Sequence, residues 1–416
     1  MARRSQSGLH GRGVAHATGS FLAPCPGKTV LSHVTDEHHR YLSDPNRMRA
    51  FHRAIQETVK PGDVVLDLAS GTGILGLLAC RAGAQRLYSI EKTGIIELAR
   101  AICRANGFEE RSVFIKGLST QVHLPERVDA VVCDQIGGFG VDAGVLEYLS
   151  DARRRFLKPG GRLVPSRVDL WLAPVESPSI GKQLRLWRNK PGGFHFLPAL
   201  EWASNTVFHI PLRPAQLLSK PVRVASIDLY TCSAAAFRVE AAFKVRRRGT
   251  LHGIGGWFSA RLSGRVRMTN SPLDRAAIDR KQVCFPLQNP IRLNAGERVW
   301  VRLHIEPKDF LVTWSVNVGR KRGGKDADES SGTLTATHST FKGRLLSRED
   351  LQRTAPTFKP RLAPLGLVRL TVLNLCAGAQ TLREIERAVY RRHRRLFGSP
   401  EEAHAFVAEV LASCAR

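Results

Sequence analysis

Two carboxylates and a glycine-rich turn are the residues in this chain best suited to bind a nucleotide-like ligand. Asp67 stands near the end of the apolar run 64–68, Gly71 and Gly73 follow it, and Glu91 ends the next apolar run. Glycines let the backbone turn sharply and come close to a ligand where a side chain would collide. A carboxylate at the end of the second strand is placed to accept hydrogen bonds from ribose hydroxyls.

The identity of that ligand depends on Asp67. Gly71, Gly73 and Gly76 also spell the GxGxxG pattern of dinucleotide sites, which is weak evidence when it stands alone. A carboxylate beside the turn would repel a pyrophosphate, whereas it would hold a cationic cofactor that carries an amino acid tail. The run DLASGTG resembles motif I of class I S-adenosylmethionine (SAM) methyltransferases, with Ala69 where a glycine is usual. We therefore expect SAM rather than a nicotinamide cofactor; a strand and turn that bind no cofactor are the alternative.

Alternating strands and helices are expected to position these residues. The run 128–133 is apolar after Asp129, as a central parallel strand should be. The pattern predicts an α/β Rossmann-like SAM methyltransferase domain, in which ligands sit at the carboxyl ends of the strands. The strands are expected at 64–68, 86–90, 113–116 and 128–133, and the helices at 33–59 (largely), 74–81, 95–106 and 146–157, with KPGG at 158–161 as the turn into a further strand.

The pattern changes from about Asp169 onward, where apolar and polar residues alternate in several runs. Such alternation is typical of half-buried antiparallel sheet, so we predict an antiparallel β-barrel or sandwich that ends near Val318. Two amphipathic helices are expected at 382–393 and 401–415. The predicted domains are a disordered basic tail at 1–29, the SAM-binding domain at 30–168, a β-barrel substrate and dimerisation domain at 169–318, a linker at 319–355 and a small helical unit at 356–416.

The composition limits the partners and the compartment. The net charge of +27 would attract polyanions or acidic polypeptides, although an arginine-rich proteome explains it equally well. The eight cysteines are scattered without a CxxC pair, so we expect neither disulfides nor a metal site, and a cytoplasmic location. No apolar run approaches the roughly 20 residues that cross a bilayer, and the N-terminus lacks the apolar core of a signal peptide.

With these parts in place, the chain from Val30 to about Val318 resembles the protein arginine N-methyltransferase family, a SAM domain followed by a β-barrel. YLSDPNRMRAF resembles that family's M-L-x-D-x-x-R, which implies that Arg47 holds the SAM carboxylate. KGLSTQVHLP resembles the loop with adenine contacts, where Thr120 replaces a glutamate. The segment 188–200 falls where the family has its dimerisation arm, which implies a homodimer.

The catalytic loop departs from the family pattern. The family uses two glutamates to clamp a substrate guanidinium, but here Asp134 takes the first position and Ala143 the second, with Asp142 beside it. Its Thr-His-Trp loop is replaced by Ile278-Asp279-Arg280. We expect Asp134 and Gln135 to orient and deprotonate the acceptor, with Asp142 as the candidate second acid. The resemblance therefore supports a protein or peptide methyltransferase more than it supports arginine as the target.

Three alternatives remain open. A nucleic-acid methyltransferase would fit the charge, but the loop reads DQIG rather than the N/D-P-P-Y/F that stacks a flipped base. A small-molecule methyltransferase and a non-catalytic SAM-binding interaction module are the other two. The last unit, through LNLCAGAQTLREIERAV, weakly resembles winged-helix domains that grip leader peptides, and a helical appendage without that role is the alternative.

Overall fold

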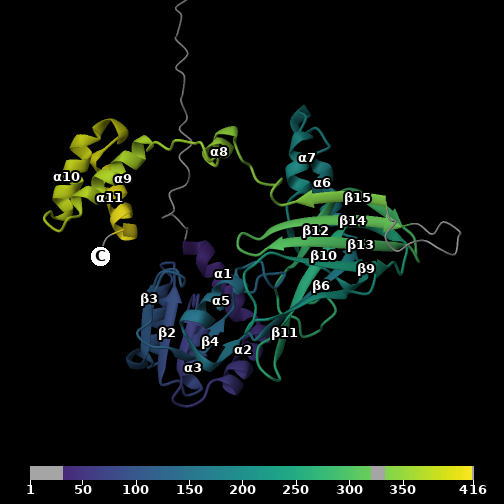
Figure 1. Cartoon of the computed structure of the whole chain (residues 1–416), viewed down its shortest axis with the longest axis horizontal. Helices are drawn as coiled ribbons and strands as arrows, with labels where there is room; N and C mark the ends of the chain where they lie inside the picture. The colour runs from purple at the N-terminus through teal and green to yellow at the C-terminus, as the bar shows by residue number, and fades with distance from the viewer. Residues whose placement is uncertain (1–30, 320–332, 415–416) are drawn as a thin grey trace, which may run out of the picture. The chain divides into compact units, whose positions relative to one another are not determined.

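The chain folds into two compact units. The computed structural model describes residues 31–319 and 333–414, so the expected basic tail at 1–29 lies outside the described residues. Val34–Leu346 form one unit, and Ser347–Arg416 belong to the second. The expected SAM-binding and β-barrel domains thus lie together in the first unit (Figure 1).

A five-stranded parallel sheet forms the first half of the larger unit. Its strand order is β3-β2-β1-β4-β5, so the order reverses beside β1 and the carboxyl end of that strand faces a ligand crevice. The expected doubly wound α/β fold is confirmed (Figure 1). The strands are β1 (Val64–Leu68), β2 (Arg86–Glu91), β3 (Ser112–Lys116), β4 (Val128–Cys133) and β5 (Leu157–Val164).

The helices around this sheet follow the apolar spacing of the sequence. The segment expected as largely helical upstream of β1 is two helices, because Asp44 caps a new one: its side chain accepts hydrogen bonds from the Asn46 and Arg47 amides, and Pro45 occupies the first helical turn. The helices are α1 (Leu31–Ser43), α2 (Pro45–Thr58), α3 (Ile74–Arg81), α4 (Ile96–Ala105) and α5 (Val145–Arg155).

The fifth strand begins earlier than expected. KPGG, expected as a turn, lies inside β5, which pairs with β4 from Leu157 onward. A register shift between Val128 and Ala130 takes up the extra residues, with Gly160 at a φ of 72°. A glycine at positive φ is typical of such a bulge, so the turn-like composition marks an irregular strand.

Two antiparallel sheets form the second half of the larger unit. One has the order β7-β12-β10-β6-β8 with β11 paired to β10, and the other has the order β15-β14-β13-β9. They share an apolar core in which the rings of Phe285 and Trp314, one from each sheet, lie 5.6 Å apart. The strands are β6 (Arg167–Val175), β7 (Phe208–Ile210), β8 (Val222–Asp228), β9 (Phe237–Lys244), β10 (Gly249–Arg261), β11 (Arg267–Thr269), β12 (Gln282–Leu293), β13 (Arg298–Glu306), β14 (Leu311–Gly319) and β15 (Thr333–Ser339).

The second sheet extends beyond the expected end near Val318. β15 lies inside the segment 319–355 that was expected to be a linker, and it pairs with β14. The buried His338 of β15 explains this pairing, because its ring stacks on Trp314 at 5.4 Å. A helix, α8 (Arg348–Arg353), lies in the same segment.

A helical arm precedes β7. It consists of α6 (Pro178–Leu186) and α7 (Pro198–Ser204), and neither helix was expected from the sequence. Their inner faces pack through Ile180, Leu184 and Leu200 against residues of the sheet, among them Val175 and Trp257, in an apolar cluster separate from the main core.

The second unit is helical, with α9 (Pro364–Leu375), α10 (Leu382–Arg392) and α11 (Pro400–Cys414) around a small valine and isoleucine core. Between 347 and 414 the structure contains no β-strand, so the wing strands of a winged-helix domain are not present in this stretch. Within the described ranges, no helix is both long enough and apolar enough to span a membrane.

Candidate active site

Asp67 lies at the carboxyl end of β1, where its carboxylate is only half satisfied. Its Oδ2 accepts a hydrogen bond from the Gly76 amide at 2.8 Å, while its Oδ1 is buried with no partner. Burial raises the pKa of this carboxyl to about 7. A ligand ammonium group would supply both the missing hydrogen bond and the missing charge, so the site fits the amino group of SAM.

The turn after β1 brings the backbone close to the upstream helix. Gly71 and Gly73 have φ angles of 54° and 80°, and Ala69 has a φ of 57°, which is rare for a residue with a side chain. A Cβ added to Gly71 would lie 2.5 Å from Cε1 of His38, on α1. The positive φ favours glycine at position 71, and a side chain there would also have to displace the ring of His38.

Glu91 ends β2 and is buried beside the same turn. Its Oε2 accepts a hydrogen bond from the Gly71 amide at 3.2 Å, and its Oε1 accepts one from the Thr93 amide at 2.9 Å. The carboxylate thus lies between the glycine turn and the loop after β2, where ribose hydroxyls would reach it.

A cavity of about 110 Å³ lies at this carboxyl edge. Ser119 lines it with a buried hydroxyl that has no partner, whereas the expected adenine contact Thr120 is not among the lining residues. Ligand pockets usually measure roughly 300–1,000 Å³, so this cavity holds only part of a nucleoside-sized ligand. The lining residues are Leu68, Ala69, Ile90, Glu91, Lys92, Gly117, Leu118, Ser119, Gln135 and Tyr148.

Asp134, at the end of β4, lies between two arginines. Arg47 donates from Nε to Oδ2 of Asp134 at 2.7 Å, and Arg280 donates from Nη2 to the same oxygen at 3.0 Å. The two guanidinium carbons lie 5.2 and 5.5 Å from the ring centre of Tyr41. Arg47 is thus bound to a protein carboxylate, and its expected contact with a cofactor carboxylate stays a prediction.

The two arginines determine the charge state of Asp134. Burial alone would raise the pKa of this carboxyl, but Arg280 and Arg47 together hold it below its ordinary value. A carboxylate held in its charged form is a weak proton acceptor, so Asp134 is better placed as a counter-ion than as a general base.

Asp142 stabilises its own loop. Its two oxygens accept hydrogen bonds from the amides of Gly138 and Phe139 at 2.9 and 2.7 Å, and Oδ2 lies 3.4 Å from Nε2 of His209. The neighbouring side chain of His209 is half exposed. Asp142 and Asp134 thus belong to the same loop, but each is already engaged by different protein groups.

Three residues at the site were missed by the sequence reasoning in this role. The sequence indicated Arg280 only as one of the residues that replace the family's Thr-His-Trp loop. No sequence pattern indicated His209, because β7 is short. Ser119 directly precedes the expected Thr120, so a shift of one position would have found it. No group of three or more His, Cys, Asp or Glu side chains suited to a metal occurs among residues 31–319 and 333–414.

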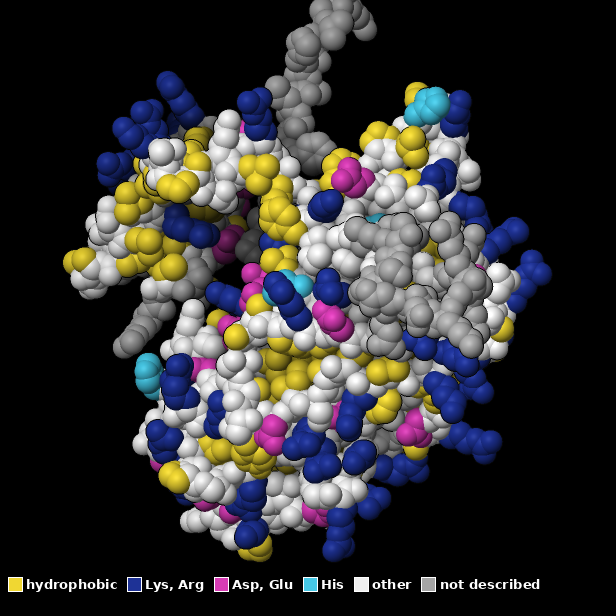
Figure 2. Space-filling model, turned by 45° about the vertical axis from the view of Figure 1, so that its right-hand side comes forward, with side chains coloured by type: hydrophobic (Ala, Val, Ile, Leu, Met, Phe, Trp, Pro, Cys, Tyr) yellow, Lys and Arg dark blue, Asp and Glu magenta, His cyan; other side chains and the backbone are white. Residues whose placement is uncertain are grey.

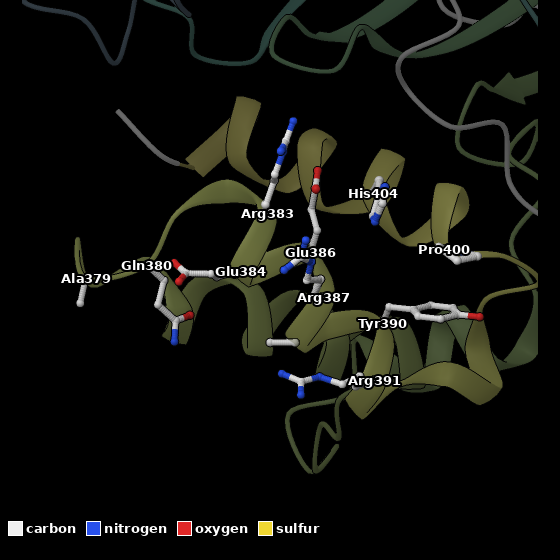
Figure 3. A pocket seen from close by; sticks show the side chains of 11 residues that line it. Ala379, Gln380, Arg383, Glu384, Glu386, Arg387, Tyr390, Arg391, Pro400 and His404 are labelled. Carbon is white, nitrogen blue, oxygen red and sulfur yellow. The ribbon is translucent and has the colours of Figure 1, made fainter.

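The second unit has a separate hollow of about 1090 Å³ beside α10 (Figure 3). Arg383 and Glu386 extend from α10 toward α11, which carries His404, and Tyr390 and Pro400 lie toward the other end (Figure 3). Arg383, Arg387 and Arg391 follow at intervals of four residues, which places them along one face of the helix. All three are exposed.

Basic side chains are not confined to that unit. On the face shown in Figure 2, Lys and Arg side chains are spread over the surface rather than gathered into one continuous patch. A stripe or patch of cations is the usual footprint of nucleic-acid binding, and this face does not show one.

Comparisons with known proteins agree with this geometry. Residues 166–316 match the family described as arginine methyltransferase oligomerization subdomain, and residues 51–168 match ribosomal protein L11 methyltransferase. The chain is 28% identical to protein arginine N-methyltransferase 6 of Xenopus tropicalis, over 68% of this chain and 90% of that protein. It is 27% identical to protein arginine N-methyltransferase PRMT10 of Arabidopsis thaliana, over 62% and 76%.

Solved structures are similar as well. The open conformation of Arabidopsis thaliana protein arginine methyltransferase 10 superposes with a TM-score of 0.63 at 25% identity, covering 73% of this chain and 97% of that one. The Trypanosoma brucei PRMT1 enzyme–prozyme heterotetramer with AdoHcy gives a TM-score of 0.64 at 22% identity, with the same coverage, and shows likeness in fold. The chain is therefore a class I SAM-dependent methyltransferase that resembles the protein arginine N-methyltransferase family.

Proposed function

We propose that this enzyme transfers the methyl group of SAM to an acceptor on a protein or peptide. The observation that carries the proposal is the buried carboxylate of Asp67, which has one oxygen without a hydrogen-bond partner and lies near Glu91 at the carboxyl edge of the parallel sheet. Proteins similar to this chain are named protein arginine N-methyltransferases. The antiparallel sheets that follow the SAM domain match the oligomerization subdomain of such enzymes, which favours a polypeptide over a small-molecule acceptor.

The cofactor-binding residues each have a distinct part in this proposal. Asp67 binds the amino group, Glu91 binds the ribose hydroxyls, and Gly71 and Gly73 allow close approach of the backbone. Ser119 offers its unpartnered hydroxyl to the remaining polar edge of the ligand. When bound, SAM supplies a methyl group already activated by its sulfonium, so the protein has mainly to position the acceptor at about 3 Å.

Arg47 would exchange partners when the cofactor arrives. In this structure it is bound to Asp134, which also holds Arg280. Transfer of Arg47 to the cofactor carboxylate would leave Asp134 with one guanidinium, so no buried charge would lose its counter-ion. Gln135 lines the cofactor cavity next to Asp134 and is placed to orient the acceptor.

Calorimetric titration of the whole chain with SAM tests the proposal at its first step. We expect one site per chain, and we expect Asp67→Asn to weaken binding because an amide cannot neutralise the ligand ammonium group. Asp279→Asn, an exposed acid outside the cavity, is the control and should leave SAM affinity unchanged. Absence of SAM binding by the wild-type chain would overturn the proposal.

We further propose that the enzyme acts as a homodimer through the arm of α6 and α7. The arm exposes several large apolar side chains, led by Phe194 at 71% and Leu197 at 55%. Exposed apolar groups clustered on one projecting element are typical of a protein interface. The family match to an oligomerization subdomain covers this arm.

For the second unit we propose a role in holding an acidic segment of the substrate polypeptide. The support is the line of exposed Arg383, Arg387 and Arg391 along the hollow, where these three arginines outnumber the two lining glutamates, Glu384 and Glu386. In fluorescence anisotropy, a glutamate-rich peptide should bind the full chain and lose affinity with Arg387→Glu. Arg361→Glu, which lies outside the hollow, is the control. Equal loss in both variants, or a preference for single-stranded nucleic acid, would contradict the role.

A cytoplasmic location is part of the same proposal. All seven cysteines within the described ranges are free thiols, as in a reducing compartment.

A further inference from the structure

A cationic hollow of about 680 Å³ lies at the amino ends of β4 and β5, on the edge of the parallel sheet opposite to the cofactor cavity. Among the described side chains that line it, four are cations and none is an acid. The four are Arg127, Arg153, Lys158 and Arg162. The irregular KPGG stretch of β5 also lines the hollow, where a Cβ added to Gly160 would meet no heavy atom within 4 Å beyond its own chain neighbours.

Two of these arginines are held in place by oxygens that carry no net charge. Arg127 donates from Nη1 to the Leu157 carbonyl at 2.7 Å. Arg153 donates from Nη1 and Nη2 to the carbonyls of Leu229 and Cys232 at 2.8 and 2.9 Å. A carbonyl fixes the orientation of a guanidinium group but does not neutralise its positive charge. Both guanidinium groups are therefore ordered before a ligand arrives, which reduces the entropy that binding costs.

The other two cations are paired with carboxylates. Lys158 donates from Nζ to Oδ2 of Asp129 at 2.8 Å, and Arg162 donates from Nη2 to both oxygens of Asp63 at 2.8 Å. Asp63 and Asp129 are not among the lining residues, so they balance Lys158 and Arg162 from outside the hollow. The hollow therefore keeps the two positive charges of its remaining arginines.

Tyr230 lines the same hollow. Its Oη accepts a hydrogen bond from the Leu163 amide at 2.9 Å, so the hydroxyl hydrogen is available to an acceptor. The nearby carboxylate of Asp228 accepts from the Tyr230 amide at 2.9 Å and from Nη2 of Arg167 at 3.1 Å. Because Asp228 has its own counter-ion, it does not cancel the excess positive charge of the hollow.

We propose that this hollow binds a phosphate dianion, either inorganic phosphate or the terminal phosphate of a phosphomonoester. A phosphomonoester carries about −1.5 to −2 charges at neutral pH, which matches the two guanidinium charges of Arg127 and Arg153. The planar fork of arginine also suits the oxygens of a phosphate group. A phosphodiester of nucleic acid carries a single charge, so it would leave one guanidinium group without a counter-ion.

The site joins two parts of the larger unit. Arg153 lies on α5, whereas the two carbonyls that it binds belong to the segment after β8. α5 also carries Tyr148, which lines the cofactor cavity, so the hollow and that cavity share one helix. A dianion bound between Arg127 and Arg153 stabilises the folded chain by mass action and needs no contact with the cofactor.

Calorimetric titration of the full chain with inorganic phosphate, at constant ionic strength in chloride, tests the proposal. We expect saturable binding at one site, and we expect Arg127→Gln to weaken it about tenfold because one of the two positive charges is lost. Arg154→Gln is the control: it removes the same charge from a side chain that is 77% exposed and outside the hollow, so it should bind phosphate as the wild type does. Thermal melting without phosphate checks that both variants are folded. Absence of saturable binding by the wild type, or equal weakening in both variants, would refute the proposal.

Three probes identify the source of the phosphate group. N-acetylphosphoserine amide and inorganic phosphate should compete for one site, whereas dimethyl phosphate, a monoanionic diester, should bind about tenfold more weakly. Tighter binding of the phosphoserine probe indicates a phosphorylated polypeptide, and tighter binding of inorganic phosphate indicates the free anion; both agree with the proposal. Dimethyl phosphate that binds as well as inorganic phosphate would contradict a site for a dianion.

Discussion

At the scale of single residues, Asp67 and Asp134 are both buried carboxylates, yet their surroundings give them opposite electrostatic roles. Burial without a cationic partner raises the pKa of Asp67, while Arg280 and Arg47 overcome burial and lower the pKa of Asp134. Asp67 is therefore ready to gain a positive ligand, and Asp134 already has its counter-ions. The same residue type thus serves cofactor binding in one place and charge balance in the other.

The raised pKa of Asp67 predicts a pH dependence of SAM binding. With a pKa of about 7 in the free protein, the carboxyl is partly protonated at neutral pH. A bound ammonium group lowers that pKa, so binding releases a proton and affinity rises with pH. Calorimetry should find SAM bound about tenfold more weakly at pH 6 than at pH 8. Asp67→Asn should flatten this profile; a wild-type profile that is already flat would contradict the assignment.

The Arg47–Asp134–Arg280 cluster could not be predicted from the sequence in this form. The motif around Asp67 to Glu91 is local, so its strand, turn and helix follow from residue types and spacing. The cluster instead joins side chains separated by 87 and 146 positions. Its geometry depends on how the loop before β12 packs against the start of α2, which no local pattern contains.

At the scale of elements, most strands and helices around the parallel sheet followed from apolar runs and caps. The exceptions have local physical causes. Glycines and a proline made β5 resemble a turn, and β15 was missed because the polar segment before it dominates the composition of 319–355. The stacking of His338 on Trp314, which holds β15 in the sheet, is a tertiary contact.

The buried His338 predicts an acid-dependent loss of stability in this sheet. Burial lowers its pKa to about 4, from an ordinary value of 6.5. As the pH falls below 6.5, His338 becomes protonated in the unfolded chain, whereas in the folded chain it stays neutral until about pH 4. The free energy of unfolding should therefore fall by about 2 kcal/mol between pH 7 and pH 4.5 from this group.

Urea unfolding at several pH values measures this contribution. His338→Phe keeps a ring against Trp314 but cannot titrate, so its unfolding should depend less on pH. His304→Gln, an exposed histidine of β13, is the control and should behave as the wild type. Equal pH dependence in the wild type and His338→Phe would rule out the assigned role.

At the scale of the whole molecule, the enzyme combines a SAM domain and two antiparallel sheets in one compact unit with a separate helical unit. The arm of α6 and α7 packs its inner faces into the first unit but carries exposed apolar side chains, led by Phe194 and Leu197. The arm lies within residues 166–316, which match an oligomerization subdomain, so we propose a second copy of the chain as its partner.

The arm predicts the oligomeric state in solution. Light scattering after size-exclusion chromatography should give the mass of a dimer for the wild type. Phe194→Asp combined with Leu197→Asp should give a monomer, because two buried apolar contacts would become buried charges. Leu273→Asp, which replaces an equally exposed leucine outside the arm, should remain dimeric. A monomeric wild type would contradict the proposed interface.

Methyl transfer itself tests the central claim most directly. The full chain is incubated with methyl-labelled SAM and an extract of cells that express it, and the products are separated by size and treated with protease or nuclease. We predict label in a protein or peptide. Protease treatment should remove the labelled product and nuclease treatment should not, and the Asp67→Asn variant should not form it. Label confined to nucleic acid or to small molecules, or no label despite tight SAM binding, would contradict a protein methyltransferase.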